Sequence, residues 1–248
     1  MSSHNDRTLA ERLDPGLASA RALDAKAIVS VTAVFLDVGE TLVDETRLWR
    51  LWAEWMGVSF ETLERELRSA IEERRHHRTV FERLRPGFDV AAARAERIAA
   101  GWPPDLAGAE DVYPDAAPCL RRLGADGYRV GIAGNQPAGI EALRDWLPAD
   151  IVASSGSWGV SKPSPVFFER VVEAAAVPAG QVAYVGDRLD NDVLPALEAG
   201  LVGVFLRRGP WGRVHATWPE ADRAHIRIDG LAELPAALAR FDGAAGLP

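Results

Sequence analysis

The stretch that decides the fold reads VTAVFLDVGETL, residues 31–42. An apolar run of six residues ends at Leu36, and Asp37 opens the segment DVGETL at 37–42. A short apolar run without alternation is typical of a strand buried on both faces of a sheet. Ligands of open parallel sheets bind outside the carboxyl ends of the strands, so we predict that Asp37 faces a binding crevice.

Further strand-like runs and helix-like stretches alternate along the rest of the chain. The strand-like runs are at 128–133, 150–153, 182–185, 201–206 and 225–228, and the helix-like stretches are at 115–124, 137–146, 165–176, 191–198 and 231–240. Apolar strands separated by amphipathic helices indicate a parallel sheet covered on both faces. The predicted fold class is therefore α/β, with a three-layer, Rossmann-like core.

Residues 46–112 interrupt this alternation, because they contain no convincing strand. Helices are predicted there at 46–57, 60–75 and 90–101, with Ser59 and Asp89 as N-caps. A helical insertion after the first strand predicts an α-helical cap domain at 46–112. The core then comprises 28–45 and 113–248, and residues 1–27 form a flexible N-terminal tail.

Two later segments carry groups that suit the crevice. The segment SKPSP at 161–165 holds Lys162, and the chain has only one other lysine, Lys26. The segment YVGDRLDND at 184–192 places Asp187 directly after a strand and Asp192 at the start of a helix. Three converging carboxylates repel one another unless a cation joins them, and Mg²⁺ prefers oxygen ligands.

In their order and spacing these segments resemble the haloacid dehalogenase (HAD) superfamily over residues 31–240. The resemblance implies that Asp37 is the nucleophile and that Lys162 is catalytic and binds the phosphate. It also implies a phosphate-binding loop at Gly134 and Asn135. The metal ligands that it implies are Asp37, the backbone carbonyl of Gly39, Asp187 and Asp192.

Two positions depart from the pattern of this family. Its phosphatases usually carry an aspartate, the general acid/base, where this chain has Gly39, and a Ser or Thr where it has Gly134. Loss of a general acid slows proton transfer by roughly 10²–10⁴-fold. Glu40 and Asp44 are candidates to replace the missing acid, and an aspartate at position 39 is expected to accelerate hydrolysis of alkyl phosphates.

The leading functional hypothesis is a Mg²⁺-dependent phosphatase that acts on a small phosphorylated metabolite through an aspartyl-phosphate intermediate. The alternative is a catalytically impaired protein that binds a phosphate ligand or has a regulatory role. Phosphonate hydrolysis would need a cap lysine, and 46–112 contains none. Dehalogenation would not need the metal pair Asp187 and Asp192.

Composition limits the partners and the location. A net charge of −8 over 248 residues argues against nucleic acid, and no run approaches the roughly 20 apolar residues of a membrane helix. The single cysteine, Cys119, is typical of a reducing, cytoplasmic protein. Either a monomer or a homodimer is compatible with the sequence. Trp49, Trp52 and Trp55 are expected to pack the cap, with a substrate-lining role as the alternative.

Overall fold

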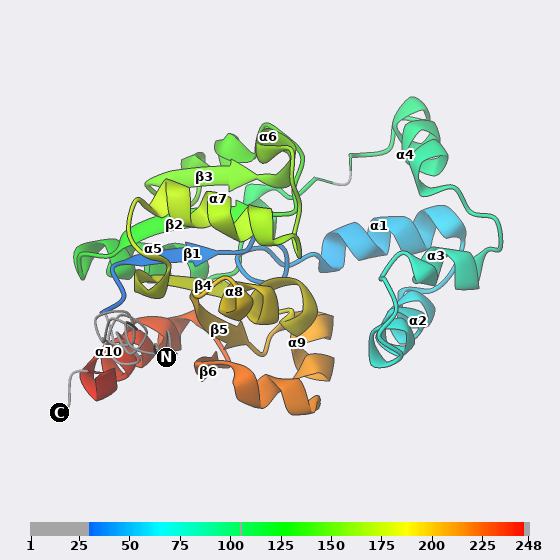
Figure 1. Ribbon diagram of the computed structural model, residues 1–248. Coiled ribbons are helices and arrows are strands. Elements are labelled where there is room, and N and C mark those ends of the chain that lie inside the picture. The colour runs from blue at the N-terminus through cyan, green and yellow to red at the C-terminus, as the bar shows by residue number, and fades with distance from the viewer. Residues whose placement is uncertain (1–29, 105, 246–248) are drawn as a thin grey trace, which may run out of the picture.

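The computed structural model describes residues 30–104 and 106–245, so the predicted tail at 1–27 lies outside the described residues. Its centre is a six-stranded sheet in the order β3-β2-β1-β4-β5-β6, in which every neighbouring pair is parallel (Figure 1). The strands are β1 Ala33–Leu36, β2 Arg129–Gly134, β3 Ile151–Ser154, β4 Val182–Gly186, β5 Val202–Leu206 and β6 Ile226–Ile228. The predicted α/β class is confirmed, and each predicted strand is present to within two residues at either end.

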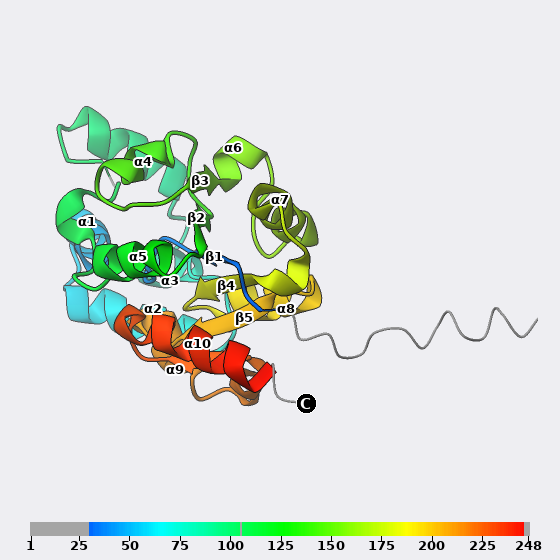
Figure 2. The same cartoon turned by 90° about the vertical axis from the view of Figure 1, so that its left-hand side faces the viewer.

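Helices cover both faces of the sheet (Figure 2). On one face, α5 Ala116–Ala125 and α10 Leu234–Ala245 pack against side chains such as Val34 and Leu36. On the other, α7 Pro165–Ala175 and α8 Leu194–Glu198 pack against Ala33 and Phe35. Successive residues of β1 thus point to opposite faces, and both faces are apolar. Among the described residues, no helix is long and apolar enough to cross a membrane.

Two predicted helices differ from expectation. The predicted helix at 137–146 is a 3₁₀ segment, Ile140–Asp145, because Pro137 and the left-handed Gly139 (φ 97°) precede it. The predicted helix at 191–198 begins as a π-turn, Leu189–Val193, before α8. Apart from the helical block at 46–99, the other elements of the described residues are two short helices and four 3₁₀ segments. The helices are α6 Ser155–Trp158 and α9 Gly209–His215, and the 3₁₀ segments are Ala109–Asp111, Ala179–Gln181, Pro219–Arg223 and Leu231–Glu233.

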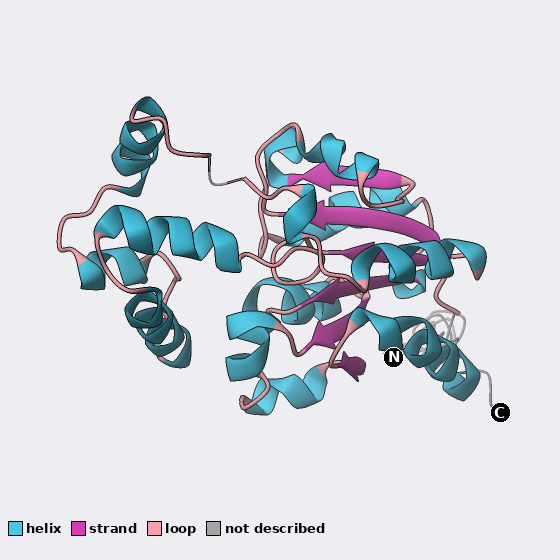
Figure 3. Cartoon of the chain, turned by 180° about the vertical axis from the view of Figure 1, so that it is seen from behind, coloured by secondary structure: helices cyan, strands magenta, loops and turns pink. Residues whose placement is uncertain are grey.

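A helical block follows β1 and lies beyond the carboxyl ends of the strands (Figures 1 and 3). It consists of α1 Thr46–Met56, α2 Phe60–Glu72, α3 Thr79–Leu84 and α4 Val90–Ala99. The predicted N-caps are present, because Ser59 accepts from Thr62 N–H and Asp89 accepts from Ala91 and Ala92 N–H. The sequence did not predict α3. Division into domains at 45/46 and 112/113 remains a prediction.

The helical block also contacts the core through α9. Trp211 and Val214 of α9 belong to the same apolar cluster as Leu63 and Leu67 of α2. At the end of α2, Arg74 donates to both carboxylate oxygens of Glu220, at 2.9 and 3.0 Å. The Arg74 guanidinium also lies 4.0 Å from the ring centroid of Trp218. A salt bridge, a cation–π contact and an apolar cluster therefore join the block to the core.

The tight packing between β1 and β2 gives a first prediction. A Cβ at Gly131 would lie 2.5 Å from Cδ1 and 2.6 Å from Cζ of Phe35, whose side chain is fully buried. We expect Gly131→Ala to lower the free energy of unfolding by about 1–3 kcal/mol, since the ring cannot move without disturbing the core. Urea denaturation measures this change.

Gly124 provides the matched control, because it is exposed near the end of α5 and nothing lies within 4 Å of a Cβ added there. Gly124→Ala should be neutral or stabilise by up to about 1 kcal/mol, through helix propensity. Equal effects of the two substitutions would contradict the packing argument.

Candidate active site

The candidate site lies where three adjacent strands end. Asp37 follows β1, Asn135 follows β2 and Asp187 follows β4, and β1 lies between the other two strands. The Asp37 N–H donates to Val185 O at 2.9 Å, which extends the ladder to the aspartate itself. The parallel sheet thus carries these side chains to one edge, as the sequence predicts.

Lys162 joins two of the carboxylates. Its ammonium lies 2.7 Å from Asp37 Oδ1 and 2.6 Å from Asp192 Oδ1, and the lysine side chain is 0% exposed. The rings of Tyr184 and Phe167 lie within 6 Å of the ammonium, with centroids at 5.4 and 5.9 Å. Burial lowers the pKa of Lys162, but the two carboxylates outweigh burial and raise it well above its ordinary value.

Asn135 positions the backbone of Lys162. Its amide donates through Nδ2 to Lys162 O at 3.0 Å and accepts at Oδ1 from Lys162 N–H at 2.8 Å. The predicted phosphate-binding asparagine therefore fixes the lysine loop, and one N–H of its amide remains to donate elsewhere.

The three predicted acidic residues form one cluster. Asp37, Asp187 and Asp192 are buried, and each has an oxygen within 4.8 Å of the others. Burial, followed by repulsion from Asp192 and Asp37, raises the pKa of Asp187 well above its usual range. Asp187 Oδ2 has no hydrogen-bond partner among the described residues. Three hard oxygen donors, one of them buried and unpaired, fit a divalent cation such as Mg²⁺.

Acidic side chains occupy the space beside both of the unusual glycines. A Cβ at Gly134 would lie 2.5 Å from Asp37 Oδ1. A Cβ at Gly39 would collide with the carboxyl of Glu45, including a contact of 2.8 Å to Cδ. A side chain at either position would displace a carboxylate.

Glu45 is the residue that sequence reasoning missed. It holds the N-cap position of α1 and is partly buried. Burial, followed by repulsion from Glu40 and Asp37, raises the pKa of the Glu45 carboxyl to about 8. No short-range motif could have found it, because its placement depends on how the chain turns between Gly39 and α1.

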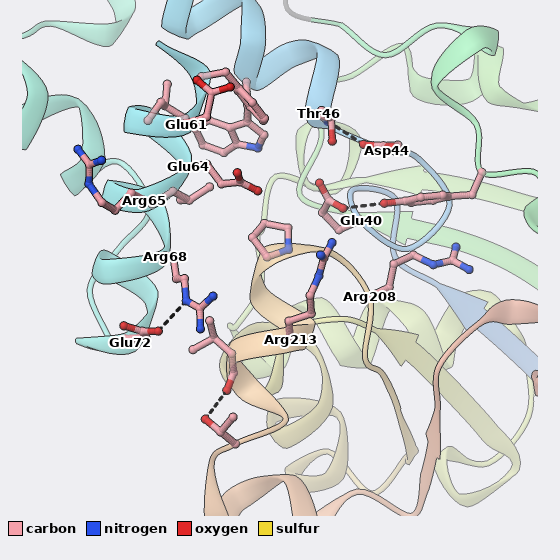
Figure 4. A pocket seen from close by; sticks show the side chains of 18 residues that line it. Glu40, Asp44, Thr46, Glu61, Glu64, Arg65, Arg68, Glu72, Arg208 and Arg213 are labelled. Carbon is pink, nitrogen blue, oxygen red and sulfur yellow. Dashed lines mark hydrogen bonds and ion pairs between the residues drawn. The ribbon is translucent and has the colours of Figure 1, made fainter. Parts of the chain in front are cut away.

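The two expected replacements, Glu40 and Asp44, are both held elsewhere. Glu40 accepts from the Tyr113 hydroxyl at 2.8 Å and from Glu45 N–H at 3.3 Å. Asp44 accepts from Thr46 N–H at 2.8 Å, at the start of α1. Both residues line the cavity of about 560 Å³ drawn in Figure 4, whose lining contains none of the predicted site residues.

A second cavity, of about 580 Å³, lies between the helical block and the predicted site. Glu45 and Asn135 line it from the side of the core, and Trp49 and Trp52 line it from α1. Both tryptophans also pack against Phe81, with ring centroids 6.2 and 5.1 Å apart. They therefore fill both roles considered from the sequence, packing and lining, whereas Trp55 packs against Trp102.

Comparison with known proteins agrees with this geometry. A family model described as haloacid dehalogenase-like hydrolase matches residues 31–200. The chain belongs to the haloacid dehalogenase-like hydrolase family.

The relatives of this haloacid dehalogenase-like chain include named phosphatases. A glyceraldehyde 3-phosphate phosphatase of Pyrococcus abyssi is 30% identical over 198 residues, which cover 72% of this chain and 82% of that protein. A protein of the same name from Methanopyrus kandleri is 34% identical over 108 residues, 40% of this chain and 45% of that protein. The chain spans about half the length of the first curated relatives that it matches.

A solved haloacid dehalogenase-like structure has the same fold. The HAD-hydrolase YfnB of Bacillus subtilis superimposes with a TM-score of 0.61 at 21% identity, covering 85% of this chain and 99% of that one. The family match over residues 31–200 confirms the predicted resemblance to the superfamily.

The loop that carries the acidic pair of this haloacid dehalogenase-like chain gives a prediction about pH. The N–H of Leu189 donates to Nδ1 of the buried His215 at 3.0 Å. Burial is the main cause that lowers the pKa of His215, from 6.5 to about 4. As the pH falls, His215 therefore takes up a proton in the unfolded chain at a higher pH than in the folded protein. The contribution of the neutral imidazole to the free energy of unfolding is complete above pH 6.5 and is lost as the pH falls toward 4. We expect His215 to account for a loss of roughly 3 kcal/mol across that window.

Urea denaturation at several pH values between 7 and 4 measures the loss. The control is His215→Asn, which keeps an acceptor near Nδ1 but does not titrate, so other titrating groups cancel in the comparison. Parallel stability curves for the two proteins would contradict the assignment.

Proposed function

We propose that this protein is a Mg²⁺-dependent phosphatase that hydrolyses phosphate monoesters of small metabolites, with Asp37 as the nucleophile. The observation that supports it most is the contact of the Lys162 ammonium with both Asp37 and Asp192, at 2.7 and 2.6 Å, beside Asp187. A carboxylate, a buried cation and two further acidic groups at one sheet edge suit phosphoryl transfer.

The proposed reaction has two chemical steps. An oxygen of Asp37 attacks phosphorus, a bond between them forms, and the bond to the leaving oxygen breaks. Water then attacks the phosphorus of the aspartyl phosphate, which releases phosphate and restores the Asp37 carboxylate. Lys162, held by Asn135, would offset negative charge on the transferring group. The leaving alkoxide needs a proton, which Gly39 cannot supply.

Four groups are proposed to hold the magnesium ion: the side chains of Asp37, Asp187 and Asp192, and the carbonyl of Gly39. The unpaired Oδ2 of Asp187 and the spacing of the three carboxylates support this assignment. When bound, the ion would neutralise negative charge on the carboxylates and on the phosphoryl oxygens.

The proposed substrate is a small phosphorylated metabolite that enters the cavity of about 580 Å³. A cavity of this size falls in the ordinary range for small-molecule sites. The relatives named glyceraldehyde 3-phosphate phosphatase make that compound the first to test. A cytoplasmic location and a monomeric or homodimeric state remain predictions.

The nucleophile is tested by Asp37→Asn, which keeps the size of the side chain but removes the charge. We expect turnover of glyceraldehyde 3-phosphate and of p-nitrophenyl phosphate to fall by more than about 10³-fold, because no aspartyl phosphate can form. Acid-quenched reactions with labelled substrate should leave phosphate on the wild-type chain only. A variant that keeps its activity would contradict the assignment.

Magnesium binding is tested by thermal denaturation without substrate. Mg²⁺ at ten times its dissociation constant should stabilise the wild-type protein by about 1.4 kcal/mol, since it binds the folded state. EDTA should reverse the effect and also abolish turnover. Asp187→Asn should remove most of the shift, whereas a shift that survives this substitution would place the ion elsewhere.

The second candidate function is a phosphate-binding or regulatory protein without turnover, and the glycine at position 39 favours it. Its signature would be Mg²⁺-dependent binding of inorganic phosphate together with no release of nitrophenolate from p-nitrophenyl phosphate. Burst kinetics with the aryl substrate would instead select the enzyme, because that leaving group needs no proton.

A further inference from the structure

We infer that Glu45 is the general acid/base of this protein, in place of the side chain that is absent at Gly39. This inference rests on the proposed phosphatase function and assigns the one step that the proposal leaves without a proton donor. Glu45 lies eight residues beyond Asp37, so it belongs to no part of the motif that predicts the nucleophile.

The Glu45 carboxyl occupies the place that a side chain at residue 39 would take. An acid carried at residue 39 would begin at a Cβ, and the Glu45 carboxyl lies on that point, with Oε1 in contact and Cδ 2.8 Å away. The second carboxyl oxygen, Oε2, is 3.3 Å from the same point. The carboxyl of Glu45, at the start of α1, therefore fills the space beside the nucleophile that a side chain at residue 39 would occupy.

The Glu45 carboxyl is also free to exchange a proton with substrate. Among the described residues, no hydrogen bond to the Glu45 carboxyl is found, although its backbone N–H donates to Glu40. Glu40 and Asp44 differ in this respect, because each accepts hydrogen bonds that hold the loop and α1 in place.

Glu45 also lies on the wall of the cavity proposed to receive the substrate. Glu45 and Asn135 both line the cavity between the helical block and the sheet edge. Glu40 and Asp44 line the other cavity, where Figure 4 shows Asp44 beside Thr46. A leaving group in the cavity of about 580 Å³ would lie on the same side as the Glu45 carboxyl.

The Glu45 carboxyl alone accounts for the proton transfers in both steps. In the first step the bond from phosphorus to the leaving oxygen breaks, and protonated Glu45 gives its proton to that oxygen, which leaves as an alcohol. In the second step water attacks phosphorus, its proton passes to the Glu45 carboxylate, and the bond from Asp37 to phosphorus breaks. Glu45 ends the cycle protonated and Asp37 ends it as a carboxylate.

This assignment changes the expectation for position 39. An aspartate introduced there must displace the Glu45 carboxyl, so Gly39→Asp exchanges one acid for another. The single substitution should therefore change alkyl phosphate turnover by no more than about tenfold, not by the 10²–10⁴-fold that a missing acid would predict.

The test compares two leaving groups in single-turnover reactions of the full chain with Mg²⁺. In Glu45→Gln, cleavage of glyceraldehyde 3-phosphate should slow by about 10²–10⁴-fold, because the leaving alkoxide receives no proton. The nitrophenolate burst from p-nitrophenyl phosphate should stay within about threefold of wild type, since that anion leaves unprotonated. Steady-state turnover of both substrates should fall, because the same group serves the second step.

Two further variants complete the test. Glu64→Gln changes an exposed acid of α2 and should leave every rate unchanged. Gly39→Asp combined with Glu45→Ala moves the carboxyl to position 39 in the space that the alanine opens. This double variant should cleave glyceraldehyde 3-phosphate at least about tenfold faster than Glu45→Ala alone.

Each result decides for or against the inference. Equal slowing of both leaving groups in Glu45→Gln, or no slowing of either, overturns the assignment while the phosphatase proposal stands. A wild-type protein with neither burst nor phosphoenzyme overturns the phosphatase proposal and this inference together. The assignment of Glu45 is supported if Glu45→Gln slows cleavage of glyceraldehyde 3-phosphate but not the nitrophenolate burst, and if the double variant restores cleavage of glyceraldehyde 3-phosphate.

Discussion

The salt bridges from Lys162 to Asp37 and Asp192 are the interaction on which the rest of the site depends. Buried carboxylates without a partner are costly, and this chain brings three to one sheet edge. One ammonium compensates two of them directly. Its position is fixed at the backbone by Asn135, and the rings of Tyr184 and Phe167 lie within 6 Å of its ammonium. Lys162, the one lysine among the described residues, therefore holds two of the three carboxylates together.

The sequence predicted the fold and this cluster because both depend on short-range rules. Apolar runs define the strands, and a residue directly after a parallel strand must lie at the carboxyl edge, as Asp37 and Asp187 do. The stretch at 137–146 does not form the expected α-helix, because Pro137 and the left-handed Gly139 interrupt its first turn. The six residues of α3 were too few to show helical periodicity.

Glu45 could not be predicted for a different reason. Its carboxyl reaches Gly39 only through a turn in which Glu40 adopts a left-handed conformation, with φ at 53°. Nothing in the local sequence specifies that turn, since Glu40 is held by Tyr113, which lies 73 residues away. The sequence shows that position 39 is a glycine. Only the tertiary structure shows that the Glu45 carboxyl fills the space beside it.

The contacts between the helical block and the core continue to the loop that carries Asp187 and Asp192. Arg74 lies over Trp218, and the rings of Trp218 and His215 are tilted against each other with centroids 4.0 Å apart. His215 in turn accepts from the N–H of Leu189, between Asp187 and Asp192. Swinging α2 away from α9 would uncover one side of the indole that supports this imidazole. The contact between the helical block and the core and the loop that carries two acidic side chains are therefore joined by one continuous series of contacting groups.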